Sequence, residues 1–132
     1  MKELLTPQTK ENKTLQSSLD VAVSAAFEKK ARDVVILELE GICSFSDRFL
    51  ISTGMSVRQT QAIADNIDEK LRQTGVRPSH VEGYGEGEWI LMDYVDFVVH
   101  VFTERTREFY DLERLWRAGT RVEVPEPTGQ RT

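Results

Sequence analysis

The sequence has little of what marks an exported, membrane-spanning or zinc-binding protein. It contains one cysteine, Cys43, so no disulfide can form within the chain. Its only histidines are His80 and His100, so the chain has few of the nitrogen and sulfur ligands that a zinc site requires. No apolar run approaches the roughly 20 residues that cross a bilayer. The first residues, MKELLTPQTKENKT, have neither the apolar core of a secretory signal nor the Arg-rich character of a transit peptide. We therefore expect a cytoplasmic protein without a metal site or cofactor.

The chain also lacks an excess of positive charge. It carries 17 Lys and Arg residues against 22 Asp and Glu residues, which gives a formal net charge of -5. This sign is opposite to that expected of a protein that holds a phosphate backbone. We therefore expect little direct nucleic-acid binding, whereas an acidic surface suits a basic protein partner.

The length and composition are those of one ordinary domain. Apolar residues make up 39% of the 132 residues and charged residues 30%, which is typical of a globular chain. The end of the chain, PEPTGQRT, has two prolines and no apolar residue. We expect a domain over residues 15–119 and flexible tails over residues 1–14 and 120–132.

Hydrophobic periodicity predicts an α/β fold. In chain order the predicted elements are a helix over residues 15–32, strands over Val34–Leu39 and Phe49–Ser52, a helix from Ser56 to Gly75, a β-hairpin over His80–Tyr94, a strand over Phe97–Phe102 and a last helix from Thr103 to Gly119. This order indicates a single-domain mixed β-sheet of about five strands with helices packed on it.

Two helix signals are specific enough to place side chains. Ser56 is followed by Gln59, a capping-box pair that satisfies backbone donors at the start of a helix. In the last helix Thr103 can act as the cap. Its apolar residues recur at helical spacing and predict a packing stripe formed by Phe109, Leu112, Leu115 and Trp116.

Three alternating glycines, Gly83, Gly85 and Gly87, could suggest a phosphate-binding loop. Such a loop leads from a strand into a helix whose N-terminus receives the phosphate. Here a strand follows the glycines, and Glu86 and Glu88 beside them would repel a phosphate. The glycines therefore predict a flexible hairpin turn.

The acidic residues do not form a recognisable catalytic set. Asp93 and Asp96 are three positions apart, so in an extended strand they point to opposite faces and cannot share a metal ion unless a turn or bulge intervenes. His100 lies in the apolar run FVVHVF and is typical of a buried histidine that is hydrogen-bonded to a neighbour such as a carboxylate. Cys43 has no nearby histidine and is read as a packed or loop residue. We identify no catalytic residue.

The most suggestive segment runs from Trp89 to Tyr94. Strand alternation puts Trp89, Leu91 and Asp93 on one face and Tyr94 on the other. The pattern allows a central strand with both faces in the core. It equally allows an open face on which Trp89 is partly exposed, and an aromatic anchor with a charged rim is the anatomy of a protein-binding hot spot. The acidic residues that would form this rim are Glu82, Glu86, Glu88 and Asp93.

At these residues the sequence resembles a known family. The segment VEGYGEGEWILMDYVDFVVHVFTERTREFYDLERLW, from Val81 to Trp116, is similar to the ribosomal silencing factor family, RsfS or Iojap. The resemblance extends back through SVRQTQAIAD, residues 56–65, and the first predicted helix. It implies a nucleotidyltransferase-like fold without evident activity. It also implies a factor that binds the large ribosomal subunit at large-subunit ribosomal protein fourteen and blocks joining of the small subunit.

The resemblance also implies a set of partner-binding residues. Trp89 matches the family tryptophan that contacts the ribosomal protein, and Glu82, Leu91, Asp93 and Tyr94 match neighbouring positions. Two alternatives remain open at this point. One is a nucleotidyltransferase-like, Mg²⁺-dependent enzyme that uses acidic residues of this region, and the other is an adaptor that acts as a homodimer.

Overall fold

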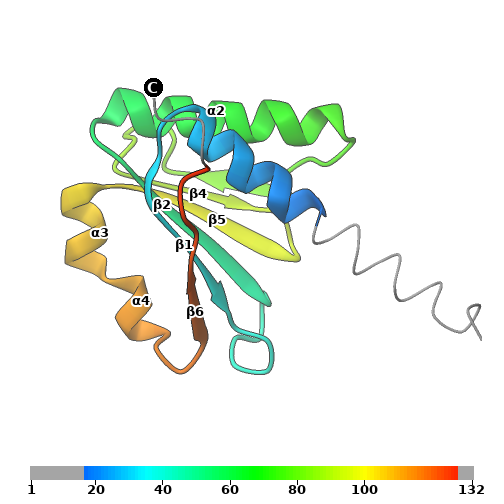
Figure 1. The fold of residues 1–132 in the computed structure, drawn as a ribbon, viewed down its shortest axis with the longest axis vertical. Coiled ribbons are helices and arrows are strands. Elements are labelled where there is room, and N and C mark those ends of the chain that lie inside the picture. Colours follow the sequence, from blue (N-terminus) through cyan, green and yellow to red (C-terminus); the bar gives the residue numbers. More distant parts are fainter. Residues whose placement is uncertain (1–16, 128–132) are drawn as a thin grey trace, which may run out of the picture.

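Six strands form one mixed sheet in the order β3-β4-β5-β2-β1-β6 (Figure 1). The computed structural model describes residues 17–127 of the chain. A first helix covers residues 17–28. The elements that follow are β1 (Arg32–Glu38), β2 (Arg48–Gly54), α2 (Val57–Gln73), β3 (His80–Glu82), β4 (Trp89–Asp93), β5 (Phe97–Thr103), α3 (Glu104–Tyr110), α4 (Leu112–Leu115) and β6 (Thr120–Glu123). The predicted mixed sheet with packed helices is confirmed, with one strand more than expected.

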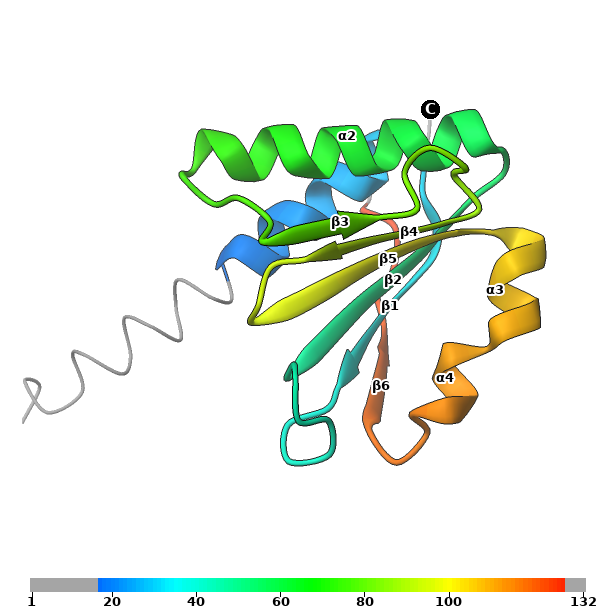
Figure 2. The same cartoon turned by 180° about the vertical axis from the view of Figure 1, so that it is seen from behind.

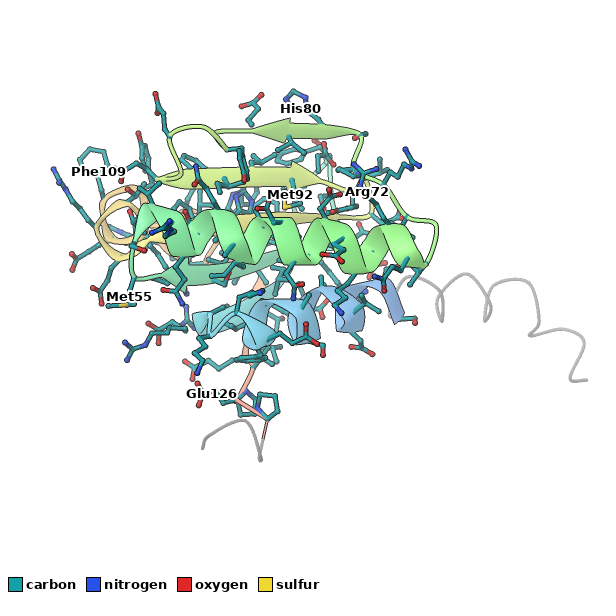
Figure 3. The ribbon with its side chains drawn as sticks, turned by 90° about the horizontal axis from the view of Figure 1, so that it is seen from above. Met55, Arg72, His80, Met92, Phe109 and Glu126 are labelled. Atoms are coloured by element: carbon teal, nitrogen blue, oxygen red, sulfur yellow. The ribbon has the colours of Figure 1, made fainter. Side chains whose placement is uncertain are left out.

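The two faces of the sheet are covered differently. The first helix and α2 lie side by side across one face of the sheet (Figure 3). Leu19, Ile63 and Ile67 are among the residues buried between these helices and the sheet. The short helices α3 and α4 lie on the opposite face (Figure 2). That face has a smaller cluster of buried residues, and Trp89 and Leu91 of β4 are only partly buried against it. The second face is therefore incompletely covered along β4.

The predicted capping pair begins α2. Ser56 Oγ accepts a hydrogen bond from the Gln59 N–H at 3.1 Å, as expected. The Gln59 side chain accepts from the Met55 N–H at 2.6 Å and donates to the carbonyls of Lys29 and Lys30 at 3.0 and 3.1 Å. The Gln59 side chain thus also holds the end of the first helix against the start of α2.

The predicted boundary at residue 119 is wrong, because Thr120–Glu123 form a strand. This strand, β6, pairs antiparallel with β1, with Val122 opposite Ile36. All four of its residues are exposed, so burial left no apolar pattern to read in the sequence. Backbone pairing with β1 defines the strand instead. The predicted flexible tail over residues 1–14 lies outside the described residues.

The predicted last helix is broken, and half of its predicted packing stripe is exposed. Asp111 adopts a left-handed conformation (φ 48°) and separates α3 from α4. This break rotates the two segments relative to each other, so residues on either side no longer share one helical face. Leu112 is buried, but Phe109 is 78% and Leu115 70% exposed. Thr103 precedes α3 without donating or accepting a side-chain cap bond.

An arginine and a glutamate hold the broken helix on the sheet. Arg107 Nε and Nη2 contact Glu113 Oε1 and Oε2 at 3.2 and 2.7 Å, which joins α3 to α4. Arg107 Nη1 donates to the Asp33 carbonyl at 2.6 Å and to Thr53 Oγ1 at 2.9 Å. Arg121 of β6 also donates to Glu113 at 2.5 Å. We call Arg107, Glu113 and Arg121 the clasp.

The turn between β4 and β5 is strained. Val95 has φ 74°, a left-handed conformation that a β-branched side chain rarely adopts, and its side chain is 61% exposed. The turn is closed by hydrogen bonds from the Tyr94 N–H to the Phe97 carbonyl at 2.9 Å and from the Asp96 N–H to the Tyr94 carbonyl at 2.8 Å. Asp93 Oδ1 accepts from the Val95 N–H at 2.8 Å. These bonds hold Val95 in its unfavourable conformation.

Glu113→Gln should destabilise the protein in a pH-dependent manner. Burial alone would raise the pKa of Glu113, but hydrogen bonds and charge from Arg107 and Arg121 outweigh it and lower that pKa below 4.5. The unfolded state therefore binds more protons below pH 4.5, so the contribution of the carboxylate is complete above that pH and lost below it. We expect a loss of roughly 1–3 kcal/mol at pH 7 in urea unfolding. A difference from wild type that stays constant down to pH 3 would contradict this assignment.

Val95→Asn should stabilise the protein. Asparagine tolerates positive φ, so the change relieves strain with little loss of buried surface, and we expect a gain of about 1 kcal/mol in the free energy of unfolding. Urea denaturation measures it. Val81→Asn is the matched control, because Val81 is also exposed but lies in β3. An equal effect of both changes would show that Val95 is not strained.

Candidate docking surface

The register of the β3-β4-β5 sheet edge brings most of the predicted site residues together. Trp89, Leu91 and Asp93 alternate along β4 and are all half-buried. Glu82 of β3 lies opposite Leu91, so it is on the same face. It is exposed and pairs with His80. The open-face interpretation of this strand therefore describes one side of β4, and its other side is core.

Tyr94 does not belong to this surface. It is buried on the opposite face, where its ring stacks on Phe97 with centroids 5.2 Å apart. Burial, with a smaller contribution from the charge of Asp68, raises the pKa of its hydroxyl, while Arg72 acts in the other direction. The prediction of Tyr94 as a surface residue is wrong, because strand alternation carries it to the side of Met92 and beneath α2.

The Trp89 indole is held on several sides. Its Nε1–H donates to Nδ1 of His100 at 3.0 Å. Its ring stacks on Phe102 with centroids 5.1 Å apart. The centroid of the Tyr110 ring of α3 lies 4.8 Å from that of Trp89. Trp89 thus bridges the sheet and α3 while part of its ring remains accessible.

His100 is buried, as the sequence predicted, but its partner is the indole of Trp89 and not a carboxylate. Burial lowers the pKa of the imidazole to about 3, so it is neutral at pH 7. Since Nδ1 accepts a hydrogen bond, the proton lies on Nε2. Nε2 is buried and has no hydrogen-bond partner among the described residues. A neutral, enclosed imidazole of this kind suits a structural role better than general acid or base catalysis.

An open pocket adjoins Trp89, between the glycine turn and α3. Its apolar wall is formed by Trp89, Phe109 and Tyr110, and Figure 3 shows Phe109 at the margin of the molecule. Its charged lining consists of Glu86, Glu88, Glu108 and Arg105. Phe109 was predicted as part of a packing stripe and Tyr110 was not singled out from the sequence, yet both are exposed and line this pocket. The surface therefore extends from β4 onto α3.

The glycines allow the turn to pass close to its neighbours, as expected of a hairpin connection. Gly83 has φ 80°, and a Cβ there would lie 2.1 Å from the Trp89 carbonyl oxygen. Gly87 has φ 70°, and a Cβ there would lie 2.5 Å from Val57 Cγ1 of α2. Side chains at these positions would displace the strand that carries Trp89.

Side-chain hydrogen bonds fix the same turn from two directions. Thr60 of α2 donates from Oγ1 to the Gly87 carbonyl at 2.6 Å. On the other side, the hydroxyls of Thr103 and Thr106 lie 3.1 and 3.0 Å from Glu88 Oε1. The turn is therefore tied to both α2 and α3, and the pocket wall is defined before any ligand is present.

The acidic residues of this region accept hydrogen bonds in the turns or lie at the surface, and they do not converge on a metal ion among the described residues. Asp93 uses Oδ1 to accept from the backbone of the β4–β5 turn. Within residues 17–127, no three His, Cys, Asp or Glu side chains are grouped so as to hold a metal ion. In the same part of the chain no helix is long and apolar enough to span a membrane. The arrangement offers an aromatic and acidic surface for docking.

Comparison with known proteins agrees with this geometry. Residues 12–132 match the family model described as "Ribosomal silencing factor during starvation", RsfS. A Bacillus subtilis protein named "Ribosomal silencing factor RsfS" is 42% identical over 101 residues, which are 76% of this chain and 86% of that protein. A mouse protein named "Mitochondrial assembly of ribosomal large subunit protein 1" is 28% identical over 74% of this chain and 44% of its own length.

A solved structure shows the same fold. The crystal structure of a Bacillus halodurans protein superposes with a TM-score of 0.73 and 41% sequence identity, covering 83% of this chain and 99% of that one. Similarity at this level extends over most of the described domain. The chain therefore belongs to the RsfS family of ribosomal silencing factors.

Proposed function

We propose that this protein binds the large ribosomal subunit in the cytoplasm and sterically blocks joining of the small subunit, which represses translation. The docking surface consists of Glu82, Trp89, Leu91 and Asp93, extended by Phe109 and Tyr110 of α3. The observation that carries the proposal is the half-buried Trp89, hydrogen-bonded to His100 and lining an aromatic and acidic pocket. The names of the B. subtilis and mouse relatives support a ribosomal role and a large-subunit association, respectively.

The proposed contact on the ribosome is large-subunit ribosomal protein fourteen. A protein with a formal net charge of -5 is repelled by RNA phosphate, so a basic ribosomal protein is the more favourable first contact. Glu86 and Glu88 supply negative charge beside the Trp89 ring. An aromatic centre surrounded by charge is the usual arrangement of a protein-binding hot spot.

Inhibition by this mechanism requires no chemical step. Bound at the subunit interface, the domain excludes the small subunit by its volume alone. The proposal therefore needs neither a nucleophile nor a general base. This agrees with the neutral, enclosed state of His100.

Trp89→Ala should weaken binding to purified large subunits by roughly 2 kcal/mol or more, about 30-fold, because it removes the central ring. It should correspondingly restore the formation of whole ribosomes in sedimentation. Circular dichroism verifies folding, since the ring also packs on Phe102 and Tyr110.

Trp116→Ala is the matched control for this change. Trp116 is also half-buried, but it packs on Phe49 and Phe45, away from the pocket. Its loss should reduce stability while binding is retained. Equal binding by wild-type protein and folded Trp89→Ala, or no effect of wild-type protein on subunit joining, would refute the proposed function.

Phe109→Ser tests the extension of the surface onto α3. Its side chain is 78% exposed, so the change should leave stability within about 0.5 kcal/mol of wild type. We expect affinity for large subunits to fall about fivefold, because apolar contact with the partner is lost. Phe45→Ser, at a 63% exposed aromatic outside the pocket, should leave affinity unchanged. If both variants bind like wild type, the docking surface does not include α3.

A further inference from the structure

His100 occupies a position where an apolar residue would be expected. It lies on β5 between Val98 and Phe102, and both of these share its face of the strand and are buried. Its ring packs on the aromatic rings of Phe49 and Phe102, with centroid distances of 4.6 and 6.1 Å. A polar group at such a position destabilises the fold unless it is hydrogen-bonded.

Within residues 17–127, the only hydrogen bond of the His100 side chain is the one from Trp89. The distance from Trp89 Nε1 to His100 Nδ1 is 3.0 Å, and Nε2 remains buried without a partner there. The fold therefore keeps an incompletely satisfied imidazole in its interior, and the contact it gains is with the central residue of the docking surface. An aliphatic residue at this position would avoid the unsatisfied group but would leave the indole N–H unpaired.

We propose that His100 is a positioning residue for Trp89: by accepting the indole N–H, it fixes the ring in the orientation that docks on the partner. This inference rests on the proposed function and adds a residue that does not itself touch the partner. Indole has a single donor, and this donor is already used inside the protein.

Trp89 therefore meets its partner with ring atoms alone. The group that covers it is an aliphatic or cationic side chain rather than a hydrogen-bond acceptor such as a backbone carbonyl. The carboxylates of Glu86 and Glu88 in the adjoining pocket favour the cationic choice. The stem of a lysine or arginine can lie on an aromatic ring while its charge remains near carboxylates.

Two nearly isosteric substitutions separate positioning from packing. His100→Asn retains an acceptor near the place of Nδ1, whereas His100→Leu has a similar shape without one. We expect His100→Leu to weaken binding to purified large subunits about tenfold, the order of one lost hydrogen bond, and His100→Asn to recover most of that loss. Ile67→Val, a core change in α2 on the other face of the sheet, controls for lowered stability.

The second readout is hydrogen exchange of the indole N–H groups, followed by NMR on the free protein. In wild-type protein the Trp89 indole should exchange more slowly than that of Trp116, which has no side-chain hydrogen bond to any residue from 17 to 127. This protection should disappear in His100→Leu, return in His100→Asn and persist in Ile67→Val. The wild-type measurement alone tests the bond, so the test remains decisive if a variant does not fold.

The outcomes separate this inference from the function on which it rests. Failure of wild-type protein to bind large subunits would refute the proposed function, while exchange would still report on the His100–Trp89 bond. If wild-type protein binds and folded His100→Leu binds equally well, His100 does not position Trp89. An unprotected Trp89 indole in wild-type protein would overturn the inference directly.

Discussion

The parallel pairing of β2 with β5 is the constraint on which the rest of the structure depends. Both strands are buried almost throughout, and together they form the centre of the sheet. Parallel neighbours cannot be joined by a tight turn, so the chain must cross the sheet between them. Here α2 and the β3–β4 hairpin make that crossing. The return places β4 beside β5 and brings the glycine turn next to α2, which positions Trp89.

The unequal covering of the two faces then creates a surface. The first helix and α2 bury one face with long apolar stripes, so the strand residues on that side need no further partner. On the other face the described part of the chain, residues 17–127, supplies only α3 and α4, broken at Asp111 and held by the clasp. A continuous helix would carry Phe109 and Leu115 onto one stripe. The break instead leaves them exposed and turns Tyr110 toward Trp89.

Much of this fold could be predicted from local signals, and the misses share a cause. The runs VVILEL and FVVHVF predicted buried strands, and Ser56 with Gln59 predicted the start of α2. Buried strands require apolar runs and helix starts favour particular capping residues, so both can be recognised in the sequence. Strand β6 depends on backbone pairing and surface charge, which leave no apolar pattern. The break at Asp111 is a single left-handed residue that helical periodicity cannot reveal. Strand alternation predicted Trp89, Leu91 and Asp93 on one face and Glu82 in their acidic rim, but the position of Glu82 directly opposite Leu91 follows only from the register.

The partner of His100 was beyond prediction for a related reason. A histidine in an apolar run indicates a hydrogen bond, but the run does not say with what, and cross-strand register decides it. Trp89 lies opposite Phe102, two register positions from the pairing of Leu91 with His100, and its indole reaches along the sheet to that histidine. A ring held in this manner loses little conformational freedom when a partner covers it, so less of the contact energy is spent on ordering. The strength of docking then depends on buried residues behind the surface as well as on those that form it.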